Sequence, residues 1–231
     1  MKPDEQKSSL GVQPHARRRI GVLLDALYNE YAAILVTAFE HEAKLRDVDL
    51  YCFAGGALHS LAGHELSRNR CYDLVSERAL DGIVVFSLSA SSEVIETFLG
   101  RYPQLPRVTI GHLVPGIPVV VSDNAAGMRE AVVHLISAHG RRKIVFLRGP
   151  ATNQEAQARF QAYRDALRDF GLEYDPALVL HGEFAMEIGK RAMRDFMEQR
   201  LDFDALVGAN DLSVLGALEV LHEHDLSLIH I

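Results

Sequence analysis

Polar side chains of mixed chemistry follow each apolar run that is expected to form a strand. They are Asp25 to Tyr31, Ser87, Ser89, His112, Ser122 to Asn124, Asn153 to Arg159, Glu183-Phe184 and Asn210-Asp211. Amides and carboxylates pair with hydroxyl groups, arginine offers a rigid fork of donors, and aromatic rings offer a flat face to a sugar or a base. No nucleophile stands beside a base in this set. It therefore predicts a binding site for a small polyhydroxylated or heterocyclic molecule rather than a catalytic centre.

Motifs for common cofactors and enzyme nucleophiles are absent from the sequence. It contains no G-x-G-x-x-G after a strand, no Gly-Lys-Ser/Thr of a P-loop and no G-x-S-x-G elbow. Cys52, His59, His64 and Cys71 are separated by six, four and six residues, which matches no zinc-ligand pattern. Cys52 is also expected to be buried in a strand. We therefore expect no enzyme activity, no cofactor and no metal ion.

Predicted strands and helices alternate along the whole chain. The strands are apolar throughout and the helices carry one apolar stripe, which is typical of parallel sheets covered on both faces. Strands are expected at about residues 19–24, 50–53, 83–86, 107–110, 119–121, 143–147, 178–180 and 205–207. Helices are expected at about 28–46, 61–78, 93–101, 127–139, 156–170, 186–199 and 212–223, with Gly140 and Gly171 ending two of them.

So many strand–helix units in 231 residues exceed one open sheet, and a Pro/Gly-rich stretch at residues 114–118 is the best boundary. The fold class expected is α/β, with two doubly wound parallel-sheet lobes. We expect a disordered leader over residues 1–18, an N-terminal lobe over 19–117 and an incomplete C-terminal lobe over 118–231. Ligands of such folds bind at the carboxyl ends of the strands. The polar residues named above are thus expected to line a cleft between the lobes.

Composition limits the cellular setting. The net charge of −7 argues against a broad nucleic-acid-binding face, and the two cysteines favour a reducing compartment. No apolar stretch is long enough to span a membrane, and the polar N-terminus is not a secretory signal. These features predict a cytoplasmic protein that does not associate with membranes.

Several sequence strings, in this order and spacing, resemble the ligand-binding core of the lactose/galactose-repressor (LacI/GalR) family. That core shares the type I fold of periplasmic sugar-binding proteins. The resemblance covers about residues 19–226. Its strings are R-R-I-G-V-L-L-D at 18–25, D-G-I-V-V at 81–85, V-S-D-N-A-A-G at 121–127, H-L-I at 134–136, H-G-R-R-K-I-V-F-L-R-G-P at 139–150, A-R-F-Q-A-Y-R-D-A-L at 158–167, G-E-F at 182–184 and A-N-D-L-S-V-L-G-A-L at 209–218.

The resemblance implies a set of ligand contacts. They fall on Tyr31, His112 (where many members have Asp), Asn153, Glu155, Arg159, Phe184 and Asn210. Asp25, Asn29 and Ser87, which follow the first and third strands, complete the expected ligand-binding site.

Some of these residues also have a purely structural interpretation. Tyr31 lies on an apolar helix stripe, so core packing is an alternative to ligand contact. Arg159 could be an exposed helix residue. Asp123 and Asp211 each precede or begin a helix, and we expect both to cap it, which leaves Asn210 as the ligand contact.

The resemblance also implies an output and a partner. A small-molecule effector would close the two lobes and switch a homodimer or an attached output module. The family's DNA-binding head needs roughly 55–60 residues, more than the 18 before the first strand, so DNA is expected to be reached only through a domain outside this chain. The family core also continues past residue 226 with a G-[FY]-D strand that is not seen here, and the ligand and output module stay open.

We therefore expect a cytoplasmic domain that senses a sugar or nucleoside for transcription regulation or signal transduction. The alternative is a DNA-binding repressor of the same family whose head is missing from this sequence. A solute-binding protein of a transporter is a third possibility, against which the missing secretory signal argues.

Overall fold

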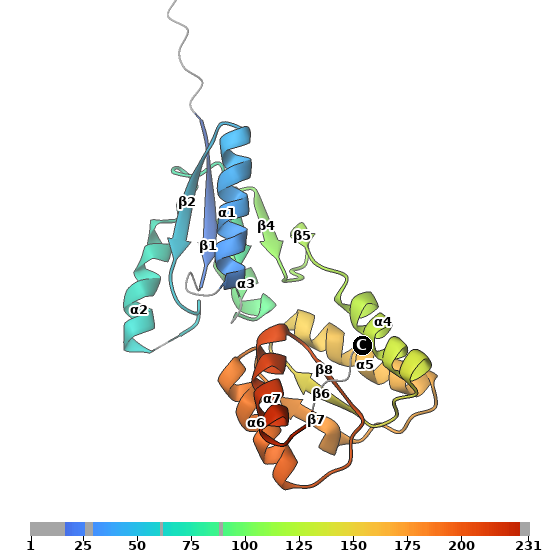
Figure 1. Ribbon diagram of the computed structural model, residues 1–231. Coiled ribbons are helices and arrows are strands. Elements are labelled where there is room, and N and C mark those ends of the chain that lie inside the picture. The colour runs from blue at the N-terminus through green and yellow to red at the C-terminus, as the bar shows by residue number, and fades with distance from the viewer. Residues whose placement is uncertain (1–16, 26–29, 61, 88–89, 227–231) are drawn as a thin grey trace, which may run out of the picture.

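The computed structural model describes residues 17–25, 30–60, 62–87 and 90–226 (Figure 1). Within these ranges the chain forms two separate sheets, and every strand pair in both is parallel. The predicted fold class, two parallel-sheet α/β lobes, is confirmed. None of the helices in the described ranges has the length and hydropathy needed to cross a bilayer. The expected leader, apart from residues 17 and 18, lies outside the described residues.

The first sheet has five strands in the order β2-β1-β3-β4-β5. These are β1 (Arg18–Leu24), β2 (Val48–Ala54), β3 (Gly82–Phe86), β4 (Arg107–Ile110) and β5 (Val119–Val120). Helix α1 (Glu30–Leu45) covers one face, over a core that includes Val22 and Leu24. Helix α2 (Gly63–Asn69), the 3-10 helix η1 (Arg70–Leu74) and α3 (Ser92–Leu99) belong to the other side, where Leu23 and Ile83 are buried.

The second sheet has three strands in the order β7-β6-β8, which are β7 (Val179–His181), β6 (Ile144–Arg148) and β8 (Ala205–Gly208). Alternate residues of β6 serve two cores. Phe146 packs with α4 (Asn124–His139) and α5 (Gln154–Asp169), and its ring stacks on Tyr163 at 4.8 Å. Leu147 packs with α6 (Met186–Glu198) and α7 (Asp211–Glu223). A 3-10 helix, η2 (Pro176–Leu178), precedes β7.

Two boundaries differ from the prediction. Strand β5 pairs with β4, so Val119 and Val120 belong to the first sheet, whereas the predicted boundary at residue 118 assigns them to the second lobe. The backbone N–H groups of Thr109 and Gly111 donate to the carbonyl oxygens of Pro118 and Val120, which holds this short strand at the sheet edge. The helix expected at 61–78 is shorter and continues as the 3-10 helix η1.

Local end signals were predicted well at two positions. Asp123 is the N-cap of α4, because its carboxylate accepts a hydrogen bond from the Ala126 N–H at 3.0 Å. Gly140 ends the same helix with φ of 64°, in the left-handed region that favours glycine. Helix α4 therefore has a defined start and end, and its start lies beside the connection from the first sheet (Figure 1).

Candidate functional site

Three polar residues predicted for the site lie together at the carboxyl edge of the first sheet. Asp25, Ser87 and His112 follow the neighbouring strands β1, β3 and β4, and all three are buried. The Ser87 hydroxyl donates to a carboxylate oxygen of Asp25 at 2.6 Å and accepts from the Ala90 N–H at 2.9 Å. These residues, which are distant in sequence, thus form a buried polar cluster at the end of the first sheet.

His112 has a defined orientation within this polar cluster. Only 1% of the residue is exposed, and its Nε2 lies 2.6 Å from the Ser87 carbonyl oxygen. A carbonyl oxygen only accepts, so Nε2 carries the hydrogen and donates. The other ring nitrogen, Nδ1, is also buried and has no hydrogen-bond partner among the described residues. A hydrogen bond to a ligand or to water would satisfy it.

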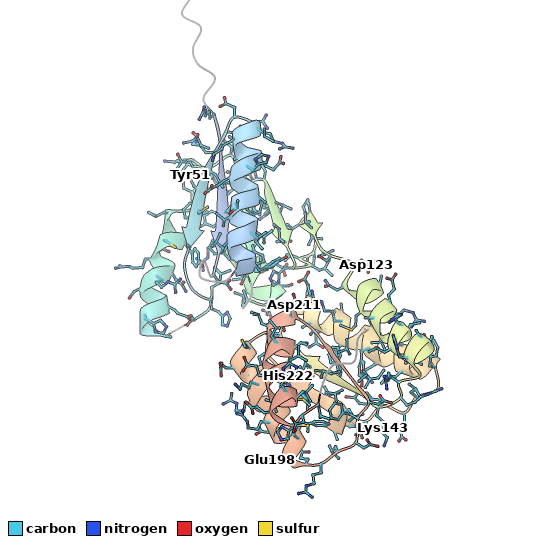
Figure 2. The ribbon with its side chains drawn as sticks, in the orientation of Figure 1. Tyr51, Asp123, Lys143, Glu198, Asp211 and His222 are labelled. Carbon is cyan, nitrogen blue, oxygen red and sulfur yellow. The ribbon has the colours of Figure 1, made fainter. Side chains whose placement is uncertain are left out.

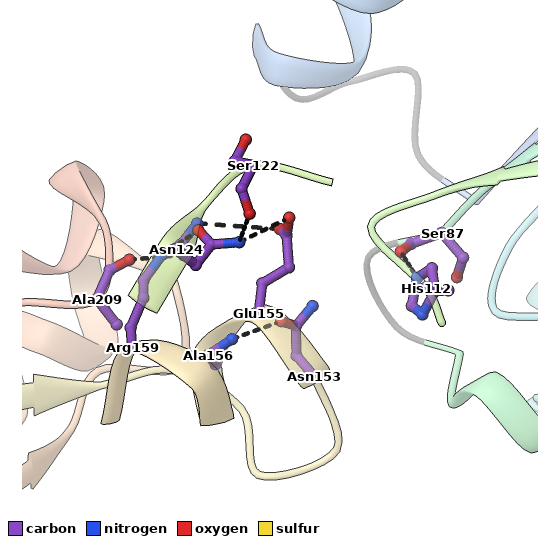
Figure 3. A network of polar contacts seen from close by, with 9 residues as sticks. All are labelled: Ser87, His112, Ser122, Asn124, Asn153, Glu155, Ala156, Arg159 and Ala209. Atoms are coloured by element: carbon purple, nitrogen blue, oxygen red, sulfur yellow. Dashed lines mark hydrogen bonds and ion pairs between the residues drawn. The ribbon is translucent and has the colours of Figure 1, made fainter. Parts of the chain in front are cut away.

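The second lobe contributes a polar network from the starts of α4 and α5 (Figure 3). Arg159 Nε donates to the Asn124 side-chain oxygen at 2.8 Å, and the Asn124 amide donates to Glu155 at 3.1 Å. Arg159 also donates to the Ala209 carbonyl oxygen at 2.8 Å and lies 3.9 Å from the Glu155 carboxylate. A cation, an amide and a carboxylate thus hold one another in place at the starts of these two helices.

Phe184 and Asn210 border this network. The Arg159 guanidinium lies 5.9 Å from the centre of the Phe184 ring, and Asn210 donates to the Phe184 carbonyl oxygen at 3.3 Å. Glu183 and Phe184 have φ of 49° and 59°, an uncommon conformation for two successive residues with side chains. The Phe184 ring also lies so close to Gly149 that a Cβ there would meet the ring at 2.9 Å or less. The turn after β7 therefore fixes an aromatic ring beside the arginine.

The two lobes touch at this site. The Leu113 N–H, after β4, donates to the Gln154 side-chain oxygen at the start of α5, at 2.8 Å. Tyr31 of α1 packs edge-on against Phe86 with ring centres 5.4 Å apart, and 48% of it is exposed. Its pKa is raised, first by burial and then by the negative charge of Glu155, while Arg159 lowers it. Tyr31 is thus within electrostatic range of the network in the other lobe.

Comparison with known proteins gives a match along almost the whole chain. Residues 17–230 match the family described as periplasmic binding proteins and sugar binding domain of LacI family. The chain belongs to this family. The resemblance inferred from the sequence strings is confirmed, and so is the expectation of a binding domain rather than an enzyme.

The LacI-family chain is similar to several transcription regulators. It is 41% identical to the HTH-type transcriptional regulator CelR of Thermobifida fusca over 99 residues, which is 43% of this chain and 29% of CelR. It is 24% identical to the ribose operon repressor of Escherichia coli K12 over 213 residues, 90% of this chain and 62% of the repressor. The chain therefore spans less than two thirds of the length of these relatives.

Solved structures agree with this assignment. A CelR–cellobiose complex superposes with a TM-score of 0.74 at 27% identity, over 90% of this chain and 64% of that one. A dimeric Lac repressor with an 11-residue C-terminal deletion gives a TM-score of 0.77 at 16% identity, over 91% of this chain and 74% of that one. At such low identity, the second likeness speaks for the fold alone.

The predicted site residues of the LacI-family domain lie where the lobes meet, with one exception. Asn29 lies outside the described residues. Asn124 bonds to Glu155 and Arg159, and Gln154 bonds to Leu113 of the other lobe. Neither residue was in the predicted ligand set. Both stand in strand-end stretches singled out above, so their position after a strand was the available signal.

Two expectations about individual residues were wrong. Asn210, rather than Asp211, is the N-cap of α7, because the Asn210 side-chain oxygen accepts from the Ser213 N–H and Asp211 is the first helical residue. Cys52 is exposed, and it lies on β2, the edge strand of the first sheet. Asn210 thus supports the turn that carries Phe184, in addition to its expected place at the ligand.

Asn153 also has a structural role, which can be tested. It is the N-cap of α5, accepts from the Ala156 N–H at 2.9 Å and is almost fully buried. Asn153→Ala is expected to lower the free energy of unfolding by about 1 kcal/mol, whereas Asn153→Asp keeps a cap oxygen and most of the stability. Urea unfolding of both variants measures the difference. Equal stability of the alanine variant and the unaltered protein would contradict the capping role.

Proposed function

We propose that this LacI-family chain is the effector-sensing domain of a transcription regulator, and that its effector is a small polyhydroxylated molecule that binds between the two lobes. The observation that carries the proposal is the polar network of Asn124, Glu155 and Arg159, which stands opposite the Ser87–His112 pair of the other lobe (Figure 3). Both groups lie at the carboxyl ends of parallel strands, where ligands of such folds bind.

The chemistry of the network favours a sugar or a nucleoside. Carboxylate and amide oxygens accept from hydroxyl groups, the guanidinium donates to them, and a hydroxyl group can form a hydrogen bond with the buried His112 Nδ1, which has no partner among the described residues. The face of Phe184 suits a sugar ring or a base. A sugar is also favoured by two similar proteins, one named for the ribose operon and one solved with cellobiose.

Effector binding would act on the arrangement of the lobes. Gln154 already joins α5 to the segment after β4, so a ligand that contacts both lobes favours the arrangement in which they touch. The change would pass to a partner copy or to an attached output domain. We propose that the protein is cytoplasmic and reaches DNA only through a domain outside this chain.

A homodimer fits the exposed apolar side chains of the first lobe. Ile34 of α1 and Tyr51 of β2 are both exposed although they are large and apolar. Each of these side chains is available to a second copy, which would remove it from water.

A ligand screen by thermal unfolding tests the proposed function. Neutral mono- and disaccharides and nucleosides are added to the full chain, and the unfolding midpoint is measured. A ligand at about 100 times its Kd stabilises the folded state by about 2.7 kcal/mol, which raises the midpoint of a protein of this size by roughly 5–10 °C. If the protein unfolds cooperatively and none of these compounds raises its midpoint, the proposal is wrong.

A further inference from the structure

Two exposed histidines meet at the C-terminal end of α4, far from the ligand-binding site. Their Nε2 atoms are 3.1 Å apart, with ring centres separated by 4.8 Å and ring planes at 75°. The same helix begins at Asn124 in the ligand network and ends at His139. At the usual helical rise, those ends are about 22 Å apart. Figure 2 labels Asp123 and Lys143, which bracket the helix and its following loop, on different sides of the second lobe.

The distance between the two Nε2 atoms suits a shared metal ion. Imidazole nitrogens bind Zn²⁺ at about 2.0–2.1 Å, so two atoms 3.1 Å apart subtend an angle of roughly 100° at one ion. That angle lies between those of octahedral and tetrahedral coordination. The rings therefore need only small rotations to act as two ligands of one ion.

The positions of the ring hydrogens allow the pair to change from a hydrogen bond to the binding of one ion. In the 3.1 Å contact one ring donates from Nε2 to the lone pair of the other. An ion needs both Nε2 lone pairs, so a neutral donor ring would move its hydrogen to Nδ1, with no net loss of a proton. Both rings are exposed, so water can accept from Nδ1.

We propose that His134 and His139 bind one divalent transition-metal ion that prefers imidazole, such as Cu²⁺, Ni²⁺ or Zn²⁺. Water completes its coordination. In the part of the chain that the structure describes, no group of three or more His, Cys, Asp and Glu side chains could hold an ion. The proposed site therefore uses two protein ligands, and its affinity depends on how well they are held in place.

The helix holds the pair firmly. Val132, Leu135 and Ile136, which lie between or beside the two histidines in sequence, are buried in the core of the second lobe. Gly140 ends the helix in the left-handed conformation, and its N–H donates to the Ile136 carbonyl oxygen. The last turn of α4 is thus fixed, and less entropy is lost when the rings bind an ion.

Two electrostatic effects at the C-terminal end of α4 act on a bound cation in opposite directions. The helix macrodipole places partial negative charge at the C-terminus, which favours a cation. Arg141 and Arg142 follow directly and oppose it, but both are exposed and screened by solvent and salt. The coordination bonds, rather than the net field, must therefore supply the affinity.

Titration calorimetry with NiCl₂ and with ZnCl₂ on the untagged full chain tests the proposal. We expect one ion per chain, and an unfolding midpoint that rises with metal concentration because the pair is brought together only in the folded helix. His134→Gln and His139→Gln should each weaken binding by about tenfold or more, since each removes one of two ligands. His41→Gln, an exposed histidine on α1, serves as the control and should bind like the unaltered protein.

Two results would overturn the proposal. One is the absence of saturable binding to the folded protein. The other is binding that persists unchanged in the double variant His134→Gln/His139→Gln, which would place the ion elsewhere. Neither result bears on the sugar or nucleoside site, because the pair lies at the opposite end of α4 from Asn124.

Discussion

Replacing Gly216 with alanine is expected to destabilise the protein by about 2 kcal/mol or more, although alanine is the better helix former. Helices α6 and α7 cross so closely that a Cβ at Gly216 would overlap the Met186 carbonyl oxygen and stand 2.8 Å from the Lys190 nitrogen. These atoms belong to the backbone and cannot rotate away. Gly189 on α6 meets the same restriction against the backbone of Ser213.

The magnitude follows from two opposing effects. Alanine gains roughly 1 kcal/mol of helix propensity over glycine. Overpacking costs typically about 1–3 kcal/mol, and more where backbone must move against backbone. Separation of α6 from α7 would also disturb the core around Met193 and Ala217, both fully buried. The steric cost therefore exceeds the gain in propensity.

Gly127→Ala is the matched control. Gly127 also lies within a helix, α4, but a Cβ there meets nothing within 4 Å. This variant should be more stable than the unaltered protein by about 0.5–1 kcal/mol, so the two substitutions have opposite signs. Urea unfolding followed by circular dichroism measures both. A Gly216→Ala variant at least as stable as the parent would show that α6 and α7 do not pack this closely.

Arg159→Ala is expected to weaken effector binding by roughly 10- to 150-fold, the equivalent of about 1.5–3 kcal/mol for a charge-assisted hydrogen bond. Arg159 donates to Asn124 and to the Ala209 carbonyl oxygen, and its side chain is 23% exposed. Its loss would remove a proposed donor for the ligand and would also release Asn124 and Glu155. Arg159→Lys keeps the charge but lacks the planar fork, so it should restore only part of the affinity.

Arg168→Ala is the control for this substitution. Arg168 lies on the same helix, and its side chain is 70% exposed in a surface ion pair with Asp165. Such pairs contribute little, so affinity and stability should both stay close to those of the parent. Calorimetry with the compound identified by the screen compares the variants. Equal affinity of Arg159→Ala and Arg168→Ala would remove Arg159 from the proposed binding site.

The alternation of apolar strands and amphipathic helices was sufficient to predict the fold class. Strands such as β6 are apolar on both faces because each face packs against a different helix pair, and this leaves a pattern that can be read in sequence. The ends of the strands followed from the same pattern. Most of the candidate site, including Asp25, Ser87 and Arg159, could therefore be located.

Features that depend on a single local conformation were predicted unevenly. Asp123 has two other capping types beside it, Ser122 and Asn124, but was identified correctly as the N-cap of α4. Asn210 and Asp211 are adjacent and both suit an N-cap, so the sequence does not distinguish them. The choice depends on which residue leaves the helical backbone, and Asn210 does so with φ of −157°.

By itself, the sequence determined the two-lobed parallel-sheet fold, the family and the strand ends at which polar residues collect. The tertiary structure decided which of those residues meet. Asn124 is 31 and 35 residues from its partners Glu155 and Arg159, and Leu113 is 41 residues from Gln154. It also decided that β5 returns to the first sheet. Periodicity reports how one segment faces its core, whereas these contacts depend on how packed helices and lobes bring distant segments together.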